Sequence, residues 1–136
     1  MVRRRIARGD PGLPTVNQVC DVTELLLMRK NLEQVEVSDE VIGYAAAIVA
    51  ATRVHPKVTV GASPRGTLAL VQLARAAALL DGRGFAIPED VKALAPAVLA
   101  HRIGLRPEVW VRRVDPEAII AEVLDQVPVP RTERRP

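Results

Sequence analysis

Three prolines stand where helices are expected to begin, and they divide the chain into short helical segments. They are Pro64 after Ser63, Pro88, and Pro116 after Asp115. Proline suits the first position of a helix because its fixed φ is already helical and its missing N–H has no partner to lose there. This punctuation favours several helices of moderate length.

The apolar residues between these starts recur at helical spacing. We expect helices over about 21–32, 38–53, 64–80, 88–102 and 116–124. In the helix that begins at Pro64, one apolar face is predicted to carry Leu70, Leu73, Ala74, Ala77 and Leu80. Pro96 falls inside the next helix and is expected to kink it, because a proline removes one backbone hydrogen bond.

Short extended segments are predicted between the helices. Their β-branched or alternating character marks residues 34–37, 57–60, 85–87 and, as the most strand-like, Glu108 to Arg112. With one Trp, one Tyr and one Phe, the core must be mostly aliphatic, which suits closely packed helices. We therefore predict an all-α fold, a small helical bundle with short extended connectors.

The length and the ends of the chain set its expected organisation. At 136 residues it amounts to one domain, predicted over 15–127, after an incomplete helix end and linker at 1–14 and before a disordered tail at 128–136. No stretch approaches the roughly 20 apolar residues of a membrane span. The basic start has no apolar region of a signal peptide behind it. The single cysteine, Cys20, is consistent with a reducing compartment, and we expect a cytoplasmic protein.

The segment from Gly61 to Gly66 is the most informative part of the sequence. Ser63 is expected to cap the helix through its hydroxyl, and Pro64 then occupies the first helical position. Arg65 falls in the first turn, where the helix dipole disfavours a cation. An anion beside Arg65 would explain that placement, and a phosphate would suit it. The plainer interpretation is a capped helix whose arginine points into solvent.

Other constellations of reactive residues are weak. The sequence holds no Gly-x-x-x-x-Gly-Lys-Ser/Thr loop to cradle phosphates. His55 and His101 lie far apart without carboxylates or thiols at ligand spacing, so we predict no metal site. Ser63 is expected to act as a cap rather than a nucleophile. Arg53 could be a second anion ligand, but its place at a helix C-terminus favours a structural role.

Several motifs in order resemble the C-terminal lid of MoxR-type AAA+ ATPases, over roughly residues 15–130. They are Ala51-Thr52-Arg53, His55-Pro56, Val60 to Gly66, Gly82-Arg83, Ile87 to Lys92, Val98 to Arg102, and Val127 to Pro130. In that family the arginine of Gly-Ala-Ser-Pro-Arg is the second-sensor residue, which reaches the γ-phosphate of ATP. The resemblance assigns that role to Arg65, with Gly61, Ser63 and Pro64 beside the nucleotide.

The resemblance also implies partners. Mg-ATP would be held mainly by an α/β core domain, in cis or encoded upstream, and the whole protein would form a homo-oligomeric ring, often a hexamer. Family members work like chaperones in metal-cofactor insertion or complex maturation, often with von Willebrand factor A domain proteins. The motifs of the core are missing from these 136 residues. We therefore expect an isolated lid, a truncated reading frame or one piece of a longer protein, without ATP hydrolysis of its own.

Two alternatives remain open at this point. A small basic helical protein, with a net charge of +3, could bind DNA through the helix at Pro64 or Pro88. Leucines on the exposed side of the first of these helices, and the lack of aromatic residues among the basic ones, make nucleic acid an improbable partner. The other alternative is a regulatory protein-interaction module.

Overall fold

The computed structural model describes residues 17–131. The predicted helix end and linker at 1–14 lie outside these residues, as does the part of the predicted tail from 132 to 136. The elements are α2 (Val22–Asn31), η1 (Leu32–Gln34), α3 (Asp39–Val54), β1 (Val58–Val60), α4 (Pro64–Leu80), α5 (Pro88–Leu99), η2 (Ala100–Arg102), β2 (Gly104–Leu105), α6 (Pro107–Val111) and α7 (Pro116–Gln126).

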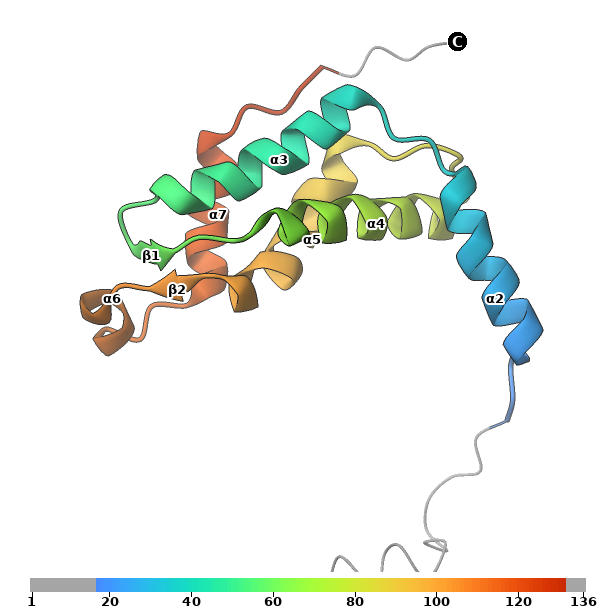
Figure 1. Cartoon of the computed structure of the whole chain (residues 1–136), viewed down its shortest axis with the longest axis horizontal. Helices are drawn as coiled ribbons and strands as arrows, with labels where there is room; N and C mark the ends of the chain where they lie inside the picture. Colours follow the sequence, from blue (N-terminus) through green and yellow to red (C-terminus); the bar gives the residue numbers. More distant parts are fainter. Residues whose placement is uncertain (1–16, 132–136) are drawn as a thin grey trace, which may run out of the picture.

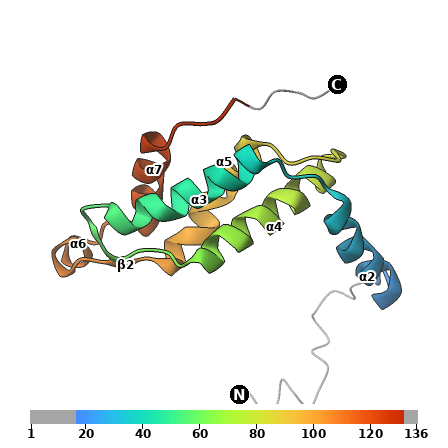
Figure 2. The ribbon, with the colours of Figure 1, turned by 45° about the horizontal axis from the view of Figure 1, so that its top comes forward.

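Helices α3, α4, α5 and α7 form a bundle, which confirms the predicted all-α class (Figure 1). The turned view shows α3 and α4 lying alongside each other, with α5 behind them (Figure 2). Most of their buried side chains are aliphatic, as the composition requires, and the exceptions are Tyr44, Thr52 and Asp90. The core consists of Val35, Val41, Tyr44, Ala45, Ile48, Val49, Ala62, Leu70, Ala74, Ala78, Ala86, Val91, Ala95, Val98, Leu99, Ile120, Val123 and Leu124.

Helices α2, α3, α4, α5 and α7 begin within one residue of the predicted positions. Pro64, Pro88 and Pro116 each open a helix. The Ser38 hydroxyl accepts a hydrogen bond from the Val41 N–H at 3.4 Å, and the Asp115 carboxylate accepts one from the Glu117 N–H at 2.9 Å. These bonds satisfy backbone donors that have no partner inside the helix.

The buried face of α4 differs from the predicted one. Leu70 and Ala74 are buried as expected, but Leu73 and Leu80 are 44% and 87% exposed. The buried stripe continues instead through small residues every fourth position, Gly66 and Ala78. Small side chains let α3 and α5 approach α4 closely, so the close packing of helices, rather than leucine content, selects the inward face.

The strand predicted at Glu108 to Arg112 is wrong. These residues lie in α6 and at its end, because Pro107 occupies a first helical position after Arg106 and the Trp110 N–H bonds to the Arg106 carbonyl at 3.0 Å. The true second strand, β2, precedes them and pairs antiparallel with β1, with Val58 opposite Leu105 and Val60 opposite Gly104. Local backbone geometry at the proline outweighs β-branched propensity here.

Helix α2 extends away from the bundle (Figures 1 and 2). A capping box starts it: the Glu24 N–H donates to the Asp21 carboxylate at 2.7 Å, and the Asp21 N–H donates to the Glu24 carboxylate at 2.8 Å. None of its side chains is buried among the described residues. The helix predicted over about 21–32 is thus present, but its apolar side chains are not part of the described core.

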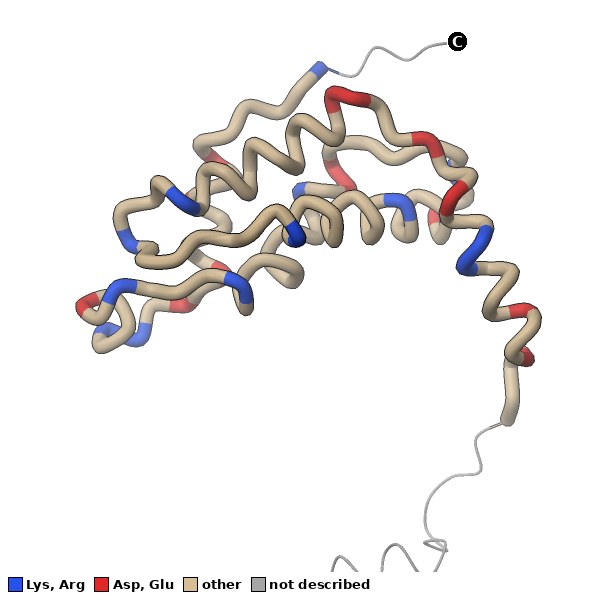
Figure 3. Tube along the Cα trace, viewed as in Figure 1, with Lys and Arg blue, Asp and Glu red and all other residues tan. Residues whose placement is uncertain are grey.

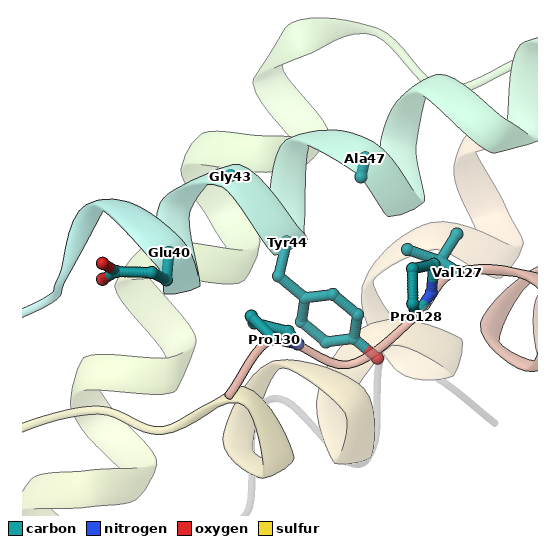
Figure 4. A pocket seen from close by; sticks show the side chains of 7 residues that line it. All are labelled: Glu40, Gly43, Tyr44, Ala47, Val127, Pro128 and Pro130. Carbon is teal, nitrogen blue, oxygen red and sulfur yellow. The ribbon is translucent and has the colours of Figure 1, made fainter. Parts of the chain in front are cut away.

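The segment that follows α7 lies beside α3. Figure 4 shows Val127, Pro128 and Pro130 around the ring of Tyr44, which is 3% exposed. The Tyr44 hydroxyl has no hydrogen-bond partner in the described part of the chain. Burial, with a smaller effect of Glu89, raises the pKa of Tyr44. Pro128 and Pro130, from the segment predicted to be disordered, thus lie against α3.

In the part of the chain that the structure describes, every helix is too short or too polar to cross a bilayer.

Candidate functional site

Arg65 lies in the first turn of α4, and its side chain is exposed. Within residues 17–131 it forms neither a hydrogen bond nor an ion pair. No acidic residue accompanies it in that first turn. An unpaired guanidinium next to a helix N-terminus concentrates positive potential at one point of the surface, which is the arrangement that an anionic group needs.

The loop before α4 is held by a buried hydroxyl of α3. Thr52 Oγ1 accepts a hydrogen bond from the Ala62 N–H at 2.9 Å and donates one to the Val49 carbonyl at 2.7 Å. Thr52 and Ala62 are both fully buried. This pair of bonds links the last turns of α3 to the loop, and so fixes the position of the residues that follow Ala62.

Arg53 holds the same loop from its other side. Its Nε donates to the Ala62 carbonyl at 3.0 Å. Gly61 packs directly on Arg53, because a Cβ at Gly61 would lie 2.6 Å from the Arg53 Cα. The structure therefore places Arg53 in the structural role that the sequence favours. Gly61 provides a close approach between two backbones, which only glycine allows here.

Ser63 occupies the N-cap position of α4 but does not cap it with its hydroxyl, contrary to the prediction. The Gly66 N–H, the donor that a serine cap would use, already bonds to the Ser63 backbone carbonyl at 2.8 Å. Ser63 and Pro64 are both exposed beside Arg65. The serine hydroxyl is consequently available to solvent or to a ligand at the same surface as the guanidinium.

Gly66 brings the start of α4 against its neighbours. A Cβ at Gly66 would lie 3.0 Å from Leu99 and 3.4 Å from Val49, so α4 begins in tight contact with α5 and α3. Together with the bonds of Thr52 and Arg53, this packing gives Arg65 a rigid base. The predicted residues Gly61, Ser63, Pro64 and Arg65 are thus brought together on one loop and helix start.

An ion-pair cluster that the sequence reasoning missed fixes the turn between α4 and α5. Arg83 donates to both oxygens of Asp90, at 2.7 and 2.9 Å, and to Asp81 at 3.0 Å. Asp90 also accepts from the Ile87 N–H at 2.9 Å. Burial alone would raise the pKa of Asp90, but these hydrogen bonds and the Arg83 charge together lower it. The signal in the sequence was an acid in the first turn after Pro88, with an arginine in the preceding turn.

A second missed cluster joins the end of α3 to α7. Glu122 accepts from the Lys57 ammonium at 2.5 Å and lies 3.3 Å from His55 Nε2, while His55 Nδ1 accepts from the Lys57 N–H at 3.3 Å. The hydrogen bond from Lys57 is the main cause that lowers the pKa of Glu122. His55 is buried and His101 is exposed. In the described ranges, no group of three His, Cys, Asp or Glu residues could hold a metal ion.

The arrangement at Arg65 suits one wall of a phosphate site. The guanidinium is unpaired, and the loop and helix start that carry it are held in place. The neighbouring Ser63 hydroxyl has no hydrogen-bond partner among the described residues that could accept its proton. A phosphate-bearing ligand here would need its other contacts from elsewhere.

Three comparisons bear on this geometry. Residues 50–123 match the AAA lid domain family. The chain is 37% identical over 118 residues to YeaC of Bacillus subtilis strain 168, and 32% identical over 132 residues to Chaperone MoxR1 of Mycobacterium tuberculosis. These alignments cover 87% and 90% of this chain, but 37% and 35% of the relatives.

A solved structure has the same fold. It is a putative ATPase from Cytophaga hutchinsonii, with a TM-score of 0.82 and 26% sequence identity. The match covers 96% of this chain and 42% of that one. The similar proteins are therefore more than twice as long as the region they share with this chain.

Proposed function

The chain belongs to the AAA lid domain family and is the lid of a MoxR-like AAA+ ATPase, and on that premise we propose that Arg65 is its second-sensor arginine. In this role the guanidinium contacts the γ-phosphate of ATP, with Ser63 and Pro64 beside the nucleotide. An α/β core domain binds the rest of the Mg-ATP and supplies the hydrolytic machinery.

The single observation that carries this proposal is the unpaired Arg65 on a rigid helix start. Most exposed arginines can move freely. Arg65 instead follows a loop whose Ala62 is bonded through both its N–H and its carbonyl to α3. A fixed backbone reduces the conformational entropy lost when the side chain binds a phosphate. Charge-assisted hydrogen bonds from a guanidinium to phosphate oxygens are also among the stronger polar contacts in proteins.

Closure of the lid over the nucleotide would strengthen the attraction between Arg65 and the phosphate. In water the attraction between Arg65 and a phosphate is screened, whereas a core domain that excludes water strengthens it. The same rigid connection transmits the nucleotide state, since movement of Arg65 carries α4 and, through Thr52 and Arg53, the end of α3. The lid thus acts as a lever that follows the presence of the γ-phosphate.

For the whole protein we propose a chaperone-like ring. The support is the name of the Mycobacterium tuberculosis relative, a chaperone, and the AAA lid family itself. A homo-oligomeric ring would place each lid next to a neighbouring subunit. We propose that this ring works in metal-cofactor insertion or in the maturation of a partner complex, together with a von Willebrand factor A domain protein. These 136 residues without a core domain are expected to show no ATP turnover.

ATP turnover in the assembled ATPase, lid and core together, tests the role of Arg65. We expect Arg65→Ala to reduce kcat by roughly a hundred- to a thousand-fold, the loss seen when one donor to a developing transition-state charge is removed. Arg65→Lys should restore part of the activity, because lysine keeps the charge but not the forked geometry. Arg131→Ala, an exposed arginine beyond α7, serves as the matched control and should leave turnover unchanged.

The thermal unfolding of each variant separates function from folding. Arg65 makes no hydrogen bond or ion pair in the described structure, so the midpoint should not change in Arg65→Ala. Normal turnover by Arg65→Ala, or turnover by the purified 136-residue chain that Arg65→Ala abolishes, would contradict the proposal.

A further inference from the structure

The end of the bundle formed by β2 and α6 exposes large apolar side chains. Trp110, the only tryptophan of the sequence, is 74% exposed, and the adjacent Val111 is 75% exposed. Helix α6 lies at the opposite end of the molecule from α2 (Figure 1). Tryptophan is a large amphipathic side chain that proteins usually cover, and an exposed one next to a second apolar residue often marks an interaction site.

The chain leaves α6 through a conformation that does not suit the residue present. Arg113 has a φ of 54°, the only positive φ of a non-glycine among the described residues. The Arg113 N–H bonds to the Trp110 carbonyl at 3.0 Å and the Val114 N–H to the Val109 carbonyl at 3.4 Å. These two bonds form a Schellman motif, in which the residue at the position of Arg113 is usually glycine.

An arginine at that position carries a conformational cost that glycine would avoid. The described structure shows no compensating contact, because Arg113 is exposed and makes no side-chain hydrogen bond or ion pair within residues 17–131. The presence of an arginine rather than a glycine at this position therefore needs an explanation. A partner protein that pairs with the Arg113 guanidinium would provide that explanation.

A hollow lies between Trp110 and the start of α7. Its volume is about 850 Å³. The lining residues are Leu105, Trp110, Val111, Arg113, Val114, Asp115 and Pro116. The wall is thus mainly apolar with one arginine at the edge, while the Asp115 carboxylate is engaged with the Glu117 N–H. Such a surface accepts an apolar side chain and a charged neighbour together.

The charges around this end favour an acidic partner. From residue 102 to residue 113 the sequence contains four arginines and one glutamate, and all five are exposed. Figure 3 shows blue segments on both sides of β2 and along α6, with red segments at α6 and at the start of α7 among them, whereas red segments predominate around the start of α3. Like charges repel a basic partner and opposite charges attract an acidic one, so the local charge selects the sign of the ligand.

We propose that the α6 surface, defined as Trp110, Val111, Arg112 and Arg113, binds an acidic segment of a partner protein through one apolar side chain of that segment. The apolar side chain packs on Trp110 in the hollow, and flanking carboxylates pair with Arg112 and Arg113. Tryptophan and arginine are the residues that most often dominate binding energy at protein interfaces. This surface includes none of the residues of the Arg65 site.

The sole tryptophan makes the proposal directly measurable with the full chain. The probe is a synthetic peptide of glutamates around one central leucine, and its match carries lysines in place of the glutamates. We expect the acidic peptide to shift the Trp110 emission to the blue, with saturation in the micromolar range, and added salt to weaken this binding. The lysine peptide should give no shift.

Arg113→Gly separates a binding role from a structural one. Glycine suits the positive φ, so the thermal midpoint should stay equal or rise, while the affinity for the acidic peptide should fall roughly three- to ten-fold. Leu80→Ala removes an even more exposed apolar side chain, at the end of α4, and should leave the affinity unchanged.

Three results would overturn the proposal. One is an unchanged Trp110 emission with the acidic peptide up to about 1 mM, the limit of weak binding. Another is an equal affinity in Arg113→Gly and wild type. The third is a blue shift that depends on the concentration of the chain alone and disappears in Val111→Asp, since a second copy would then cover the surface.

Discussion

The position of Arg65 depends on residues of α3 that hold the loop before it. The guanidinium is exposed and unpaired in the described structure, but the loop that carries it is fixed by Thr52 and Arg53 of α3. Glycine at position 61 is needed because the loop backbone passes so near Arg53. The placement of one charge therefore depends on three neighbours whose own chemistry is purely structural.

Thr52 gives the first test of this dependence. Thr52→Val keeps the shape but leaves the buried Ala62 N–H without an acceptor, so we expect a loss of about 1–3 kcal/mol in the free energy of unfolding. Urea denaturation measures it. Thr59→Val is the matched control, because Thr59 is exposed in β1 and should change stability little. An unchanged stability of Thr52→Val would show that the loop is not held in this way.

Asp90 gives the second test, through pH. Its pKa in the folded protein is lowered, so its contribution to stability is present above the unfolded pKa of about 3.9 and is lost as pH falls through the folded value. We expect the free energy of unfolding to decrease from pH 5 toward pH 3 and below. Asp90→Asn should be less stable at pH 7 and lose less stability on acidification.

The control for that experiment is Asp125→Asn. Asp125 is exposed on α7 and has no ion pair or side-chain hydrogen bond in the described residues. Urea denaturation at pH 7, 5 and 3 should therefore give the wild-type dependence for this variant. A wild-type pH dependence in Asp90→Asn as well would exclude Asp90 as a source of it.

At the scale of single residues, the sequence singled out Arg65 as a candidate but not the residues that hold its loop. Arg65 stands out because it opposes the helix dipole, which is a local property. The bond from Ala62 to Thr52 joins positions ten residues apart, and Glu122 meets Lys57 across 65 residues. Such pairings depend on how helices pack, and no local spacing specifies them. The expected hydroxyl cap of Ser63 failed because a backbone carbonyl had already taken the donor.

Among the elements, α2 is the least supported. It has a capping box, yet none of its side chains is buried in the described structure. A helix of ten residues is marginal in water without tertiary contacts. Five of its apolar side chains are at least half exposed: Val22, Leu25, Leu26, Leu27 and Met28.

We expect the backbone amides of α2 to exchange with deuterium far faster than those of α3 when the 136-residue chain is studied alone. Local opening of α2 breaks no core contact, whereas opening of α3 exposes Ile48 and Val49. Hydrogen exchange followed by mass spectrometry measures the difference. Protection of α2 equal to that of α3 would mean that another surface covers it.

Element starts were predictable because they are local. Prolines at first helical positions set the beginnings of α4, α5 and α7, and acids in the first turn accompany them in α5 and α7. The error at α6 arose because Val109, Trp110 and Val111 are β-branched or aromatic residues with high strand propensity, while Pro107 just before them starts a helix. Which face of α4 is buried could not be predicted from α4 alone, because α3 and α5 pack against its small residues rather than its leucines.

As a whole, the molecule is a lid in which the Arg65 loop and α6 are linked through a pair of short strands. The loop that carries Arg65 follows β1, β2 pairs with β1, and α6 follows β2 at the end of the molecule (Figure 1). The helical bundle has a tightly packed, largely aliphatic core, so displacement of one element moves its neighbours. The sequence predicted this fold class and the family, while the exposed α6 surface emerged only from the structure.

The central claim is that Arg65 recognises the γ-phosphate, and the most direct measurement compares nucleotides. Affinities for ADP and for a non-hydrolysable ATP analogue are measured in the assembled ATPase with wild-type lid and with Arg65→Ala. We predict an unchanged affinity for ADP and a roughly 10- to 100-fold loss for the ATP analogue, as expected for one charged hydrogen-bonding contact. Equal affinities of wild type and Arg65→Ala for the ATP analogue would contradict the claim.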